Sequence, residues 1–313
     1  MKKKVVVALG HRALGTTLPE QKEAVKRSAG MIADLIEEGY QVAITHSNAP
    51  QLGMIHTALN EFGKSHTDYT QAPMSVCSAM SQGYIGYDLQ NALREELLDR
   101  GIQKDCATML TQVEVSPDDP AFKNPTKPIG SFMTKEEADE LVREKGYKVI
   151  EDSGRGYRRV VASPKPVSIV EIDTIKALVE SNHVVIACGG GGIPVFKTGG
   201  HHLKGAAAVI DKDFAAEKLA EQLNADCLII LTAVEKVAIH FGTPEQEALS
   251  ELTPELAEKY IEEGEFPAGS MLPKVEAAVA FAKSGKGRKA LITLLEKAED
   301  GIEGKTGTEI ELT

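Results

Sequence analysis

Short apolar runs alternate with longer amphipathic segments along most of this chain. Lys4–Leu9 is rich in β-branched residues and predicts a strand, and four later runs do the same. The first three of the five runs are almost uniformly apolar, and residues 227–231 of the fourth run are continuously apolar. Such runs are typical of strands that are covered on both faces of a parallel sheet. The four later runs are residues 41–45, 184–188, 226–232 and 290–294.

The segments between these runs carry helical signals. Thr17 and Glu20 have the spacing of a capping box, the apolar residues that follow share one helical face, and Gly39 ends the pattern. Further helices are predicted at 172–180, 214–223, 254–263 and 275–283. Strands that alternate with helices predict an α/β fold with an open, mainly parallel sheet sandwiched by helices.

Residues 121–165 break this alternation. They are rich in Pro, Gly and charge, with ten Lys or Arg against seven Asp or Glu and one helical pattern at 135–145. In one interpretation, these residues form a solvent-exposed segment that leaves the main domain and returns to it. The other is a basic subdomain that protrudes from a single domain spanning 1–313, in which the prolines of 124–128 hold Lys127 in a defined direction.

Composition narrows the possible partners. The chain has 313 residues, 42% of them apolar, and a formal charge of −11, which argues against general binding to nucleic acid or to anionic membranes. No apolar run reaches the ~20 residues of a membrane span. The four cysteines are far apart, so we expect reduced thiols and a cytoplasmic protein.

Three loops that follow predicted strands are candidates for ligand binding, because ligands of open α/β sheets bind at the carboxyl ends of the strands. The segment 10–15 offers backbone amides for phosphate or is an ordinary strand end. The segment 45–51 offers small polar donors or is an Asn/Pro turn. The four glycines of 189–192 allow either close backbone approach to a ligand or tight internal packing.

The positions of two lysines bear on whether the chain binds an anion. Lys212 lies between Asp211 and Asp213, which is consistent with a plain surface ion-pair cluster. Lys274 follows Pro273 at a predicted helix start, where a cation is favourable only beside an anion, so we expect a polyphosphate there. The chain lacks the P-loop, the nucleophile elbow and the zinc-helix motifs.

Together these segments resemble carbamate kinases, which are members of the amino acid kinase family. The resemblance covers nearly the whole chain. The motifs that carry it, in order, are ALG at 8–10, TH.N.PQ.G at 45–53, AMSQGYIGY at 79–87, NPTKPIG at 124–130, DSGRGYRRVV at 152–161, IACGGGGIPV at 186–195, VIDKD at 209–213, FGTPEQ at 241–246 and GSMLPKVEAA at 269–278.

The resemblance implies a homodimer that transfers a phosphoryl group reversibly between ATP and carbamate with Mg²⁺, in the catabolic direction from ADP and carbamoyl phosphate. The catalytic residues that it implies are Lys127, Lys212, Lys274 and Asp211. The implied substrate-binding residues are Gly10, His11, Arg12, Ser47, Asn48, Ala49, Gly189, Gly190 and Gly191. The implied nucleotide-binding residues are Lys212, Thr232, Ala233, Val234, Phe241, Gly242, Thr243, Met271 and Lys274, with Mg²⁺ held through the phosphates rather than by protein ligands.

Two loops depart from the family pattern. Carbamate kinases typically read Gly-Gly-Asn-Ala where this chain has 10–13, and His-Gly-Asn-Gly-Pro where it has 46–50. In one hypothesis His11 takes a positive φ and keeps the turn, Arg12 replaces a neutral donor, and the acceptor changes. In another the chain binds nucleotide without transferring phosphate. In a third, His11 and Arg12 simply face solvent.

Overall fold

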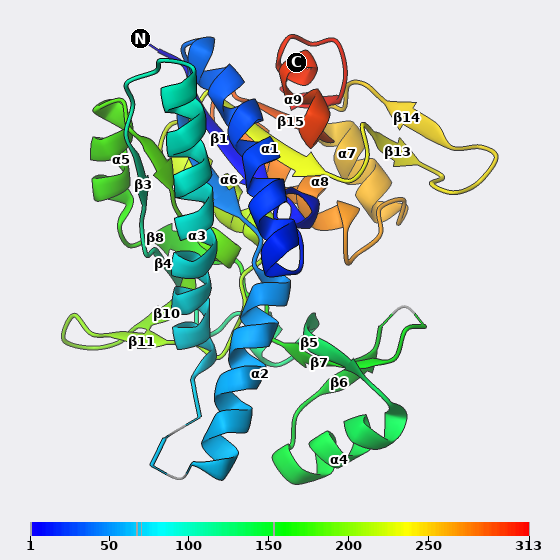
Figure 1. The fold of residues 1–313 in the computed structure, drawn as a ribbon. Coiled ribbons are helices and arrows are strands. Elements are labelled where there is room, and N and C mark those ends of the chain that lie inside the picture. Colours follow the sequence, from blue (N-terminus) through cyan, green and yellow to red (C-terminus); the bar gives the residue numbers. More distant parts are fainter. Residues whose placement is uncertain (1, 67, 70, 153, 313) are drawn as a thin grey trace.

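A parallel sheet with β1 at its centre organises the computed structural model, which describes residues 2–66, 68, 69, 71–152 and 154–312 (Figure 1). Its strand order is β16-β15-β12-β1-β2-β9-β3, and only the edge strand β16 is antiparallel to its neighbour. The predicted strands are therefore five adjacent members of one sheet. The strands are β1 (Lys4–Leu9), β2 (Gln41–His46), β3 (Cys106–Thr108), β9 (Val184–Ile186), β12 (Cys227–Thr232), β15 (Lys289–Leu294) and β16 (Thr308–Glu311).

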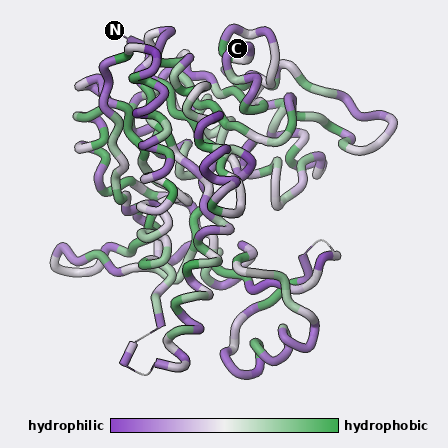
Figure 2. Tube along the Cα trace, viewed as in Figure 1, coloured by the Kyte–Doolittle hydropathy of each residue, from purple (hydrophilic) through white to green (hydrophobic). Residues whose placement is uncertain are grey.

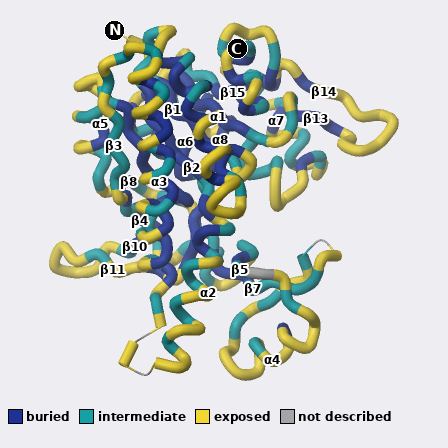
Figure 3. The backbone as a smooth tube through the Cα atoms, in the orientation of Figure 1, coloured by how far each residue is buried: buried dark blue, intermediate teal, exposed yellow. Residues whose placement is uncertain are grey.

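Both faces of this sheet are covered, which explains why its strands are apolar throughout. On β1, Val5 and Val7 join a buried cluster with residues of α1 (Leu18–Glu37) and α3 (Met74–Asp99). Val6, on the opposite face, joins a second cluster with α6 (Lys212–Gln222) and α8 (Met271–Lys283). Figure 3 shows the sheet as the most deeply buried part of the chain. The predicted fold class is confirmed.

The predicted helices are present, with small shifts at their ends. The capping box of Thr17 and Glu20 opens α1, and α5 covers Ile172–Glu180 as predicted. The helix α7 covers Pro254–Glu262, and α8 begins four residues before its predicted start because Pro273 fits in a first helical turn.

Other helices were missed. The expected loop over 45–51 is wrong from Ala49 onward, since α2 (Ala49–Ser65) starts there with Pro50 in its first turn. The long α3 and the short α9 (Ala298–Ile302) were not predicted either.

Smaller sheets extend from this core. A second sheet has the order β11-β10-β4-β8, and β13 pairs with β14 in an antiparallel ribbon. Sequence reasoning missed these strands, because each has only three to five residues, which is too few to establish a pattern. They are β4 (Gln112–Val115), β8 (Pro166–Ile169), β10 (Ile193–Lys197), β11 (Leu203–Gly205), β13 (Val237–Ile239) and β14 (Glu247–Leu249).

The basic segment 121–165 contains a sheet of its own. Its strands, in the order β5-β7-β6, are β5 (Lys127–Met133), β7 (Tyr157–Val161) and β6 (Val149–Glu151), and α4 (Lys135–Lys145) lies against them. Figure 1 shows this unit beside α2, apart from the helices that cover the main sheet. A small buried cluster that includes Leu52, Ile129 and Val161 joins the unit to the rest of the molecule.

The run of four glycines forms a buried turn after β9. Cys188 has a φ of 54°, and Gly189–Gly191 form a 3-10 helix. A Cβ on Gly190 would lie 2.0 Å from the Asn48 side chain, and one on Gly191 would lie 2.2 Å from the backbone oxygen of Ile210. Tight internal packing therefore accounts for these glycines by itself. Their contact with a substrate stays a prediction.

Polar and apolar residues are distributed as expected for a two-layered core. Apolar residues concentrate along the central strands, and polar residues along the outer helices and loop tips (Figure 2). Each of the four cysteines has a free thiol. None of the helices in the described part of the chain combines the length and apolar composition needed to cross a bilayer.

A stability comparison isolates the packing of the glycine turn. Gly191 and Gly39 both have a φ of 91°, but a Cβ on Gly39 would meet no atom within 4 Å. Gly39→Ala should therefore cost only the backbone penalty of about 1 kcal/mol, whereas Gly191→Ala should cost roughly 2–4 kcal/mol because the clash is added. Urea unfolding of the two variants measures this difference. Equal destabilisation would contradict it.

Candidate functional site

A cleft of about 410 Å³ lies at the carboxyl ends of four adjacent strands of the main sheet. Residues that follow β1, β2, β12 and β15 line one side, and the first turns of α6 and α8 line the other. Lys127 reaches in from β5. Ligands of open α/β sheets bind at this edge. The lining includes Gly10, His11, Arg12, Ser47, Lys127, Asp211, Lys212, Asp213, Thr232, Ala233, Ser270, Lys274 and Glu296.

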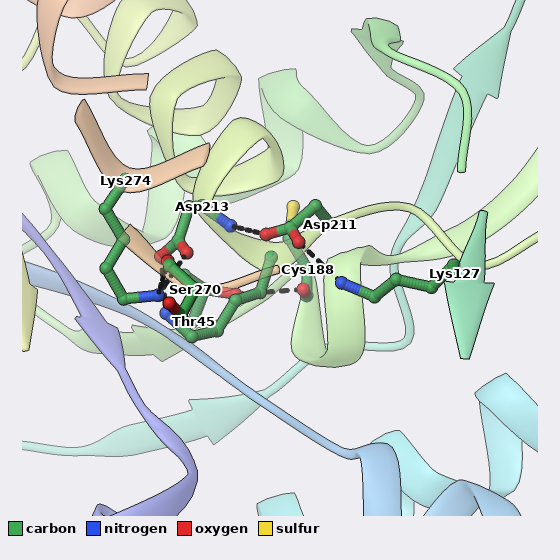
Figure 4. A network of polar contacts seen from close by, with 8 residues as sticks. Thr45, Lys127, Cys188, Asp211, Asp213, Ser270 and Lys274 are labelled. Carbon is green, nitrogen blue, oxygen red and sulfur yellow. Dashed lines mark hydrogen bonds and ion pairs between the residues drawn. The ribbon is translucent and has the colours of Figure 1, made fainter. Parts of the chain in front are cut away.

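Three lysines from distant parts of the sequence meet two aspartates in this cleft. The Nζ atom of Lys127 lies 2.5 Å from Oδ2 of Asp211. Lys212 and Lys274 contact the two oxygens of Asp213 at 2.5 Å and 3.0 Å. Figure 4 shows Lys127 approaching Asp211 from one side while Lys274 approaches Asp213 from the other. The structure thus brings the three predicted lysines to one place.

Local structure explains how these side chains are aimed. Asp211 is the N-cap of α6, and its Oδ1 accepts a hydrogen bond of 3.0 Å from the amide of Asp213. Lys274 lies in the first turn of α8, where its ammonium also donates to the carbonyl of Ser270 at 3.1 Å. The positive ends of two helix dipoles therefore point toward the cleft.

Burial makes these charges strongly interdependent. The side chain of Asp213 is 2% exposed and that of Lys212 is 11% exposed, so the interpretation of Lys212 as part of a surface cluster is wrong. Burial, with help from Lys274, lowers the pKa of Lys212 against the raising effect of Asp213. Burial alone would raise the pKa of Asp211, but Lys127 and the Asp213 amide lower it on balance.

The anion that Lys274 requires is already present within the protein. Its closest carboxylate is Asp213, which also binds Lys212. The position of Lys274 is therefore explained without a bound polyphosphate. Three cations against two anions still leave this network one positive charge in excess, in a chain whose formal charge is −11.

The loop after β1 places the side chains of two basic residues at the cleft. His11 and Arg12 are exposed, yet both line the cavity. Arg12 has no carboxylate within ion-pair distance in the part of the chain that the structure describes. The hypothesis of a positive φ at His11 is wrong, because 11–13 form a 3-10 helix and the positive φ of this loop belongs to Gly15. Gly10 is fixed by packing, since a Cβ there would lie 2.6 Å from the backbone oxygen of Leu231.

The side chains of the loop after β2 lie partly in the cleft and partly in the core. Ser47 lines the cleft, and its Oγ is buried with no hydrogen-bond partner among the described residues. Asn48 turns inward and donates to Oγ of Ser81 at 2.8 Å. His46 is fully enclosed, and this burial lowers its pKa to about 4, so the ring is neutral. Ala49 lines a neighbouring cavity instead of the cleft.

The predicted nucleotide residues are only partly brought together. Thr232 and Ala233 line the cleft beside Lys212 and Lys274. The remaining ones lie outside its lining, as do the glycines of the buried turn. Phe241 is 59% exposed on the loop between β13 and β14. The predicted residues outside the lining are Asn48, Ala49, Gly189, Gly190, Gly191, Val234, Phe241, Gly242, Thr243 and Met271.

Sequence reasoning missed the residue that links the lysines. Asp213 was visible beside Lys212, but nothing in the sequence distinguished it from an ordinary first-turn acid. Glu296 was also missed, although it lies just after β15 and the strand-end rule that identified the other loops could have found it.

Known proteins similar to this chain belong to the family that the sequence motifs indicated. The model of the amino acid kinase family matches residues 3–293. The chain is 61% identical to the carbamate kinase-like protein YqeA of Escherichia coli over 99% of both chains. It is 54% identical to the carbamate kinase of Clostridium perfringens over 98% of this chain and 99% of the relative.

A solved structure gives the same result in three dimensions. The carbamate kinase of Giardia lamblia bound to AMP-PNP superposes with a TM-score of 0.91 at 39% identity, over 100% of this chain and 99% of the other. The resemblance drawn from the sequence motifs is thus confirmed. The chain belongs to the amino acid kinase family and, within it, to the group formed by carbamate kinases and carbamate kinase-like proteins.

Proposed function

We propose that this protein transfers a phosphoryl group reversibly between ATP and carbamate, and that it runs from ADP and carbamoyl phosphate toward ATP. The observation that carries the proposal is the meeting of Lys127, Lys212 and Lys274 in one cleft at the rim of the sheet. Relatives that cover nearly the whole chain are carbamate kinases, which supports this choice of reaction.

The chain's own residues supply charge and position. In the reaction, a carbamate oxygen forms a bond to the γ-phosphorus while the bond from that phosphorus to the oxygen bridging to the β-phosphate breaks. Little covalent work remains for side chains, so positioning and charge compensation dominate. Lys212 and Lys274 bind the nucleotide phosphates, Lys127 binds the transferring group, and Asp211 orients Lys127 through their 2.5 Å contact.

The two ends of the reactants extend along different loops. The adenosine end lies along Thr232–Val234, Phe241–Thr243 and Met271, of which Thr232 and Ala233 already line the cleft. The carbamate end lies between 10–12 and 47–49, with the buried glycine turn behind it. The free Oγ of Ser47 is a ready hydrogen-bond donor to it.

Magnesium fits this arrangement as part of the nucleotide substrate. Mg²⁺ favours one or two carboxylates together with phosphate oxygens, and Asp211 and Asp213 provide carboxylates at the cleft. Among the described residues, no group of three acidic, His or Cys side chains forms a protein-only cage. When bound, the ion neutralises phosphate charge.

We also propose a homodimer in the cytoplasm, with 121–165 acting as a subdomain that positions Lys127. The exposed Tyr87 and Leu18 lie beside a groove between α1 and α3, and a second copy would cover these apolar side chains. The four free thiols, three of them buried, suit a reducing compartment. Light scattering should give a mass of twice that of one chain for the wild type, and the mass of a single chain for Tyr87→Glu. A monomeric wild type would contradict the dimer.

The reaction is tested by ATP formation from ADP, carbamoyl phosphate and Mg²⁺. Lys127→Ala should lower kcat about 10²–10³-fold, because it removes one preorganised charge from the transition state. Lys123→Ala removes the same charge from an exposed position outside the cleft and should leave kcat unchanged. As a control, circular dichroism spectra of both variants should match that of the folded wild type. Equal activity of folded Lys127→Ala and wild type would contradict the assignment.

A second candidate function rests on His11, Arg12 and Ser47, which line the cleft where carbamate kinases typically have Gly, Asn and Gly. It is transfer to a different small acid, or nucleotide binding without transfer. A panel of small carboxylates with an ADP-release assay separates these outcomes from the first proposal. If nucleotide binds without turnover, the double variant His11→Gly, Arg12→Asn should switch transfer on.

For the carbamate reaction, Arg12 should contact the phosphate of carbamoyl phosphate, because its guanidinium is the cleft cation without an ion pair among the described residues. Arg12→Asn should raise KM for carbamoyl phosphate roughly 10-fold or more, since a charge-assisted hydrogen bond is lost. Arg27→Asn, an exposed change on α1, is the matched control. An unchanged KM in Arg12→Asn would show that Arg12 faces solvent.

A further inference from the structure

A second cavity, of about 210 Å³, lies between α2 and the sheet of the basic segment. We call it the junction pocket. Its walls include His56 and Asn60 from α2, Lys145 from α4, Tyr147, and Arg159 from β7. It shares none of its described lining residues with the catalytic cleft.

The two cations of the junction pocket outnumber the one carboxylate in its described lining, that of Glu61. Arg159 and Lys145 have no carboxylate within ion-pair distance among the described residues. The acid on the rim, Glu61, is paired with Lys64 at 2.5 Å. The chain is acidic as a whole, so a pocket with unmatched cations departs from its average composition.

Arg159 is held in a defined orientation. Its guanidinium carbon lies 3.5 Å from the centroid of the Tyr147 ring, and the side chain is only partly exposed. A guanidinium stacked on an aromatic face keeps its N–H groups pointing outward in its own plane, in the geometry that binds a carboxylate with two hydrogen bonds. Such stacking reduces the freedom that a ligand would otherwise have to restrict.

The floor of the junction pocket is apolar. Leu52, Met74 and Ile129 line it and belong to the small buried cluster that joins the basic segment to the main body. A cationic rim over an apolar floor suits an anion with a hydrocarbon portion better than a bare inorganic ion.

We propose that the junction pocket binds a small organic carboxylate, held by Arg159, Lys145 and His56 over an apolar floor. His56 would contribute a ring N–H donor, since burial, followed by the charges of Arg159 and Lys145, lowers the pKa of its ring and favours the neutral form. Burial also lowers the pKa of Arg159. A bound carboxylate would offset the repulsion between the charges of Arg159 and Lys145.

The ligand would bridge two parts of the molecule. His56 lies on α2, whereas Arg159 lies on β7, whose residues pair with β5 in the register Arg159 to Ile129 and Val161 to Lys127. An occupied junction pocket would therefore fix the strand that carries Lys127 relative to α2.

The test is a titration of the full-length protein with sodium isovalerate, followed by the ring NMR signals of its eight histidines. The His56→Gln variant assigns the signal of His56. We expect that signal to shift and saturate, while the signal of His11, which lines the catalytic cleft, stays in place. This readout requires no kinase activity.

Variants identify the cations involved. Arg159→Gln should weaken binding at least tenfold, because a bidentate charge-assisted contact is lost. Lys145→Gln changes an exposed side chain, so it should fold normally and weaken binding several-fold. Arg143→Gln removes an equal charge from α4 outside the junction pocket and should leave the affinity within a factor of two.

Four results would overturn the proposal: no saturable shift at His56, saturation at His11 alone, equal weakening by Arg143→Gln and Lys145→Gln, or tighter binding of inorganic phosphate than of isovalerate at His56. The last would reassign the junction pocket to inorganic anions.

Discussion

The two contacts between Asp213 and the ammonium groups of Lys212 and Lys274 hold the candidate site together. Bringing two lysines to one buried place without an anion would be strongly unfavourable, because like charges repel and both lose hydration. Asp213, 2% exposed at the start of α6, compensates this repulsion. Asp211 does the same for Lys127. The cleft is therefore assembled before any ligand arrives, and an entering polyphosphate must compete with carboxylates that already occupy the lysines.

This arrangement depends on the order of strands in the main sheet. Because β15, β12, β1 and β2 are neighbours and parallel, their carboxyl ends place four loops along one rim. The first turns of α6 and α8 lie at the same rim. The tightly packed glycine turn behind β9 fixes Asn48 and leaves Ser47 at the cleft. Three of the differences from typical carbamate kinases, at His11, Arg12 and Ser47, line this cleft, and the fourth, at Ala49, lines a neighbouring cavity.

Much of this architecture could be predicted from sequence. Apolar strands and capping signals placed the main sheet and α1, and the strand-end rule led to Gly10 and Ser47. Thr232 was implied by the family resemblance alone. Short strands such as β11 and β13 carry too few residues for a pattern. The roles of Asp213 and Asn48 could not be predicted, because both depend on partners far away in sequence. The glycine run was ambiguous for the same reason, since its neighbours are Asn48, Ile210 and Val113.

Lys127 differs from the other lysines in how it is supported. Lys212 and Lys274 stand on helices packed against the main sheet, whereas Lys127 belongs to a strand of the separate three-stranded sheet. Its position is set through the few side chains of the small cluster that contains Leu52, Ile129 and Val161. A methylene removed there would scarcely weaken the main core. It would displace the ammonium group, so under the proposed role of Lys127 variation at these buried apolar positions would change the rate of transfer more than the stability of the fold.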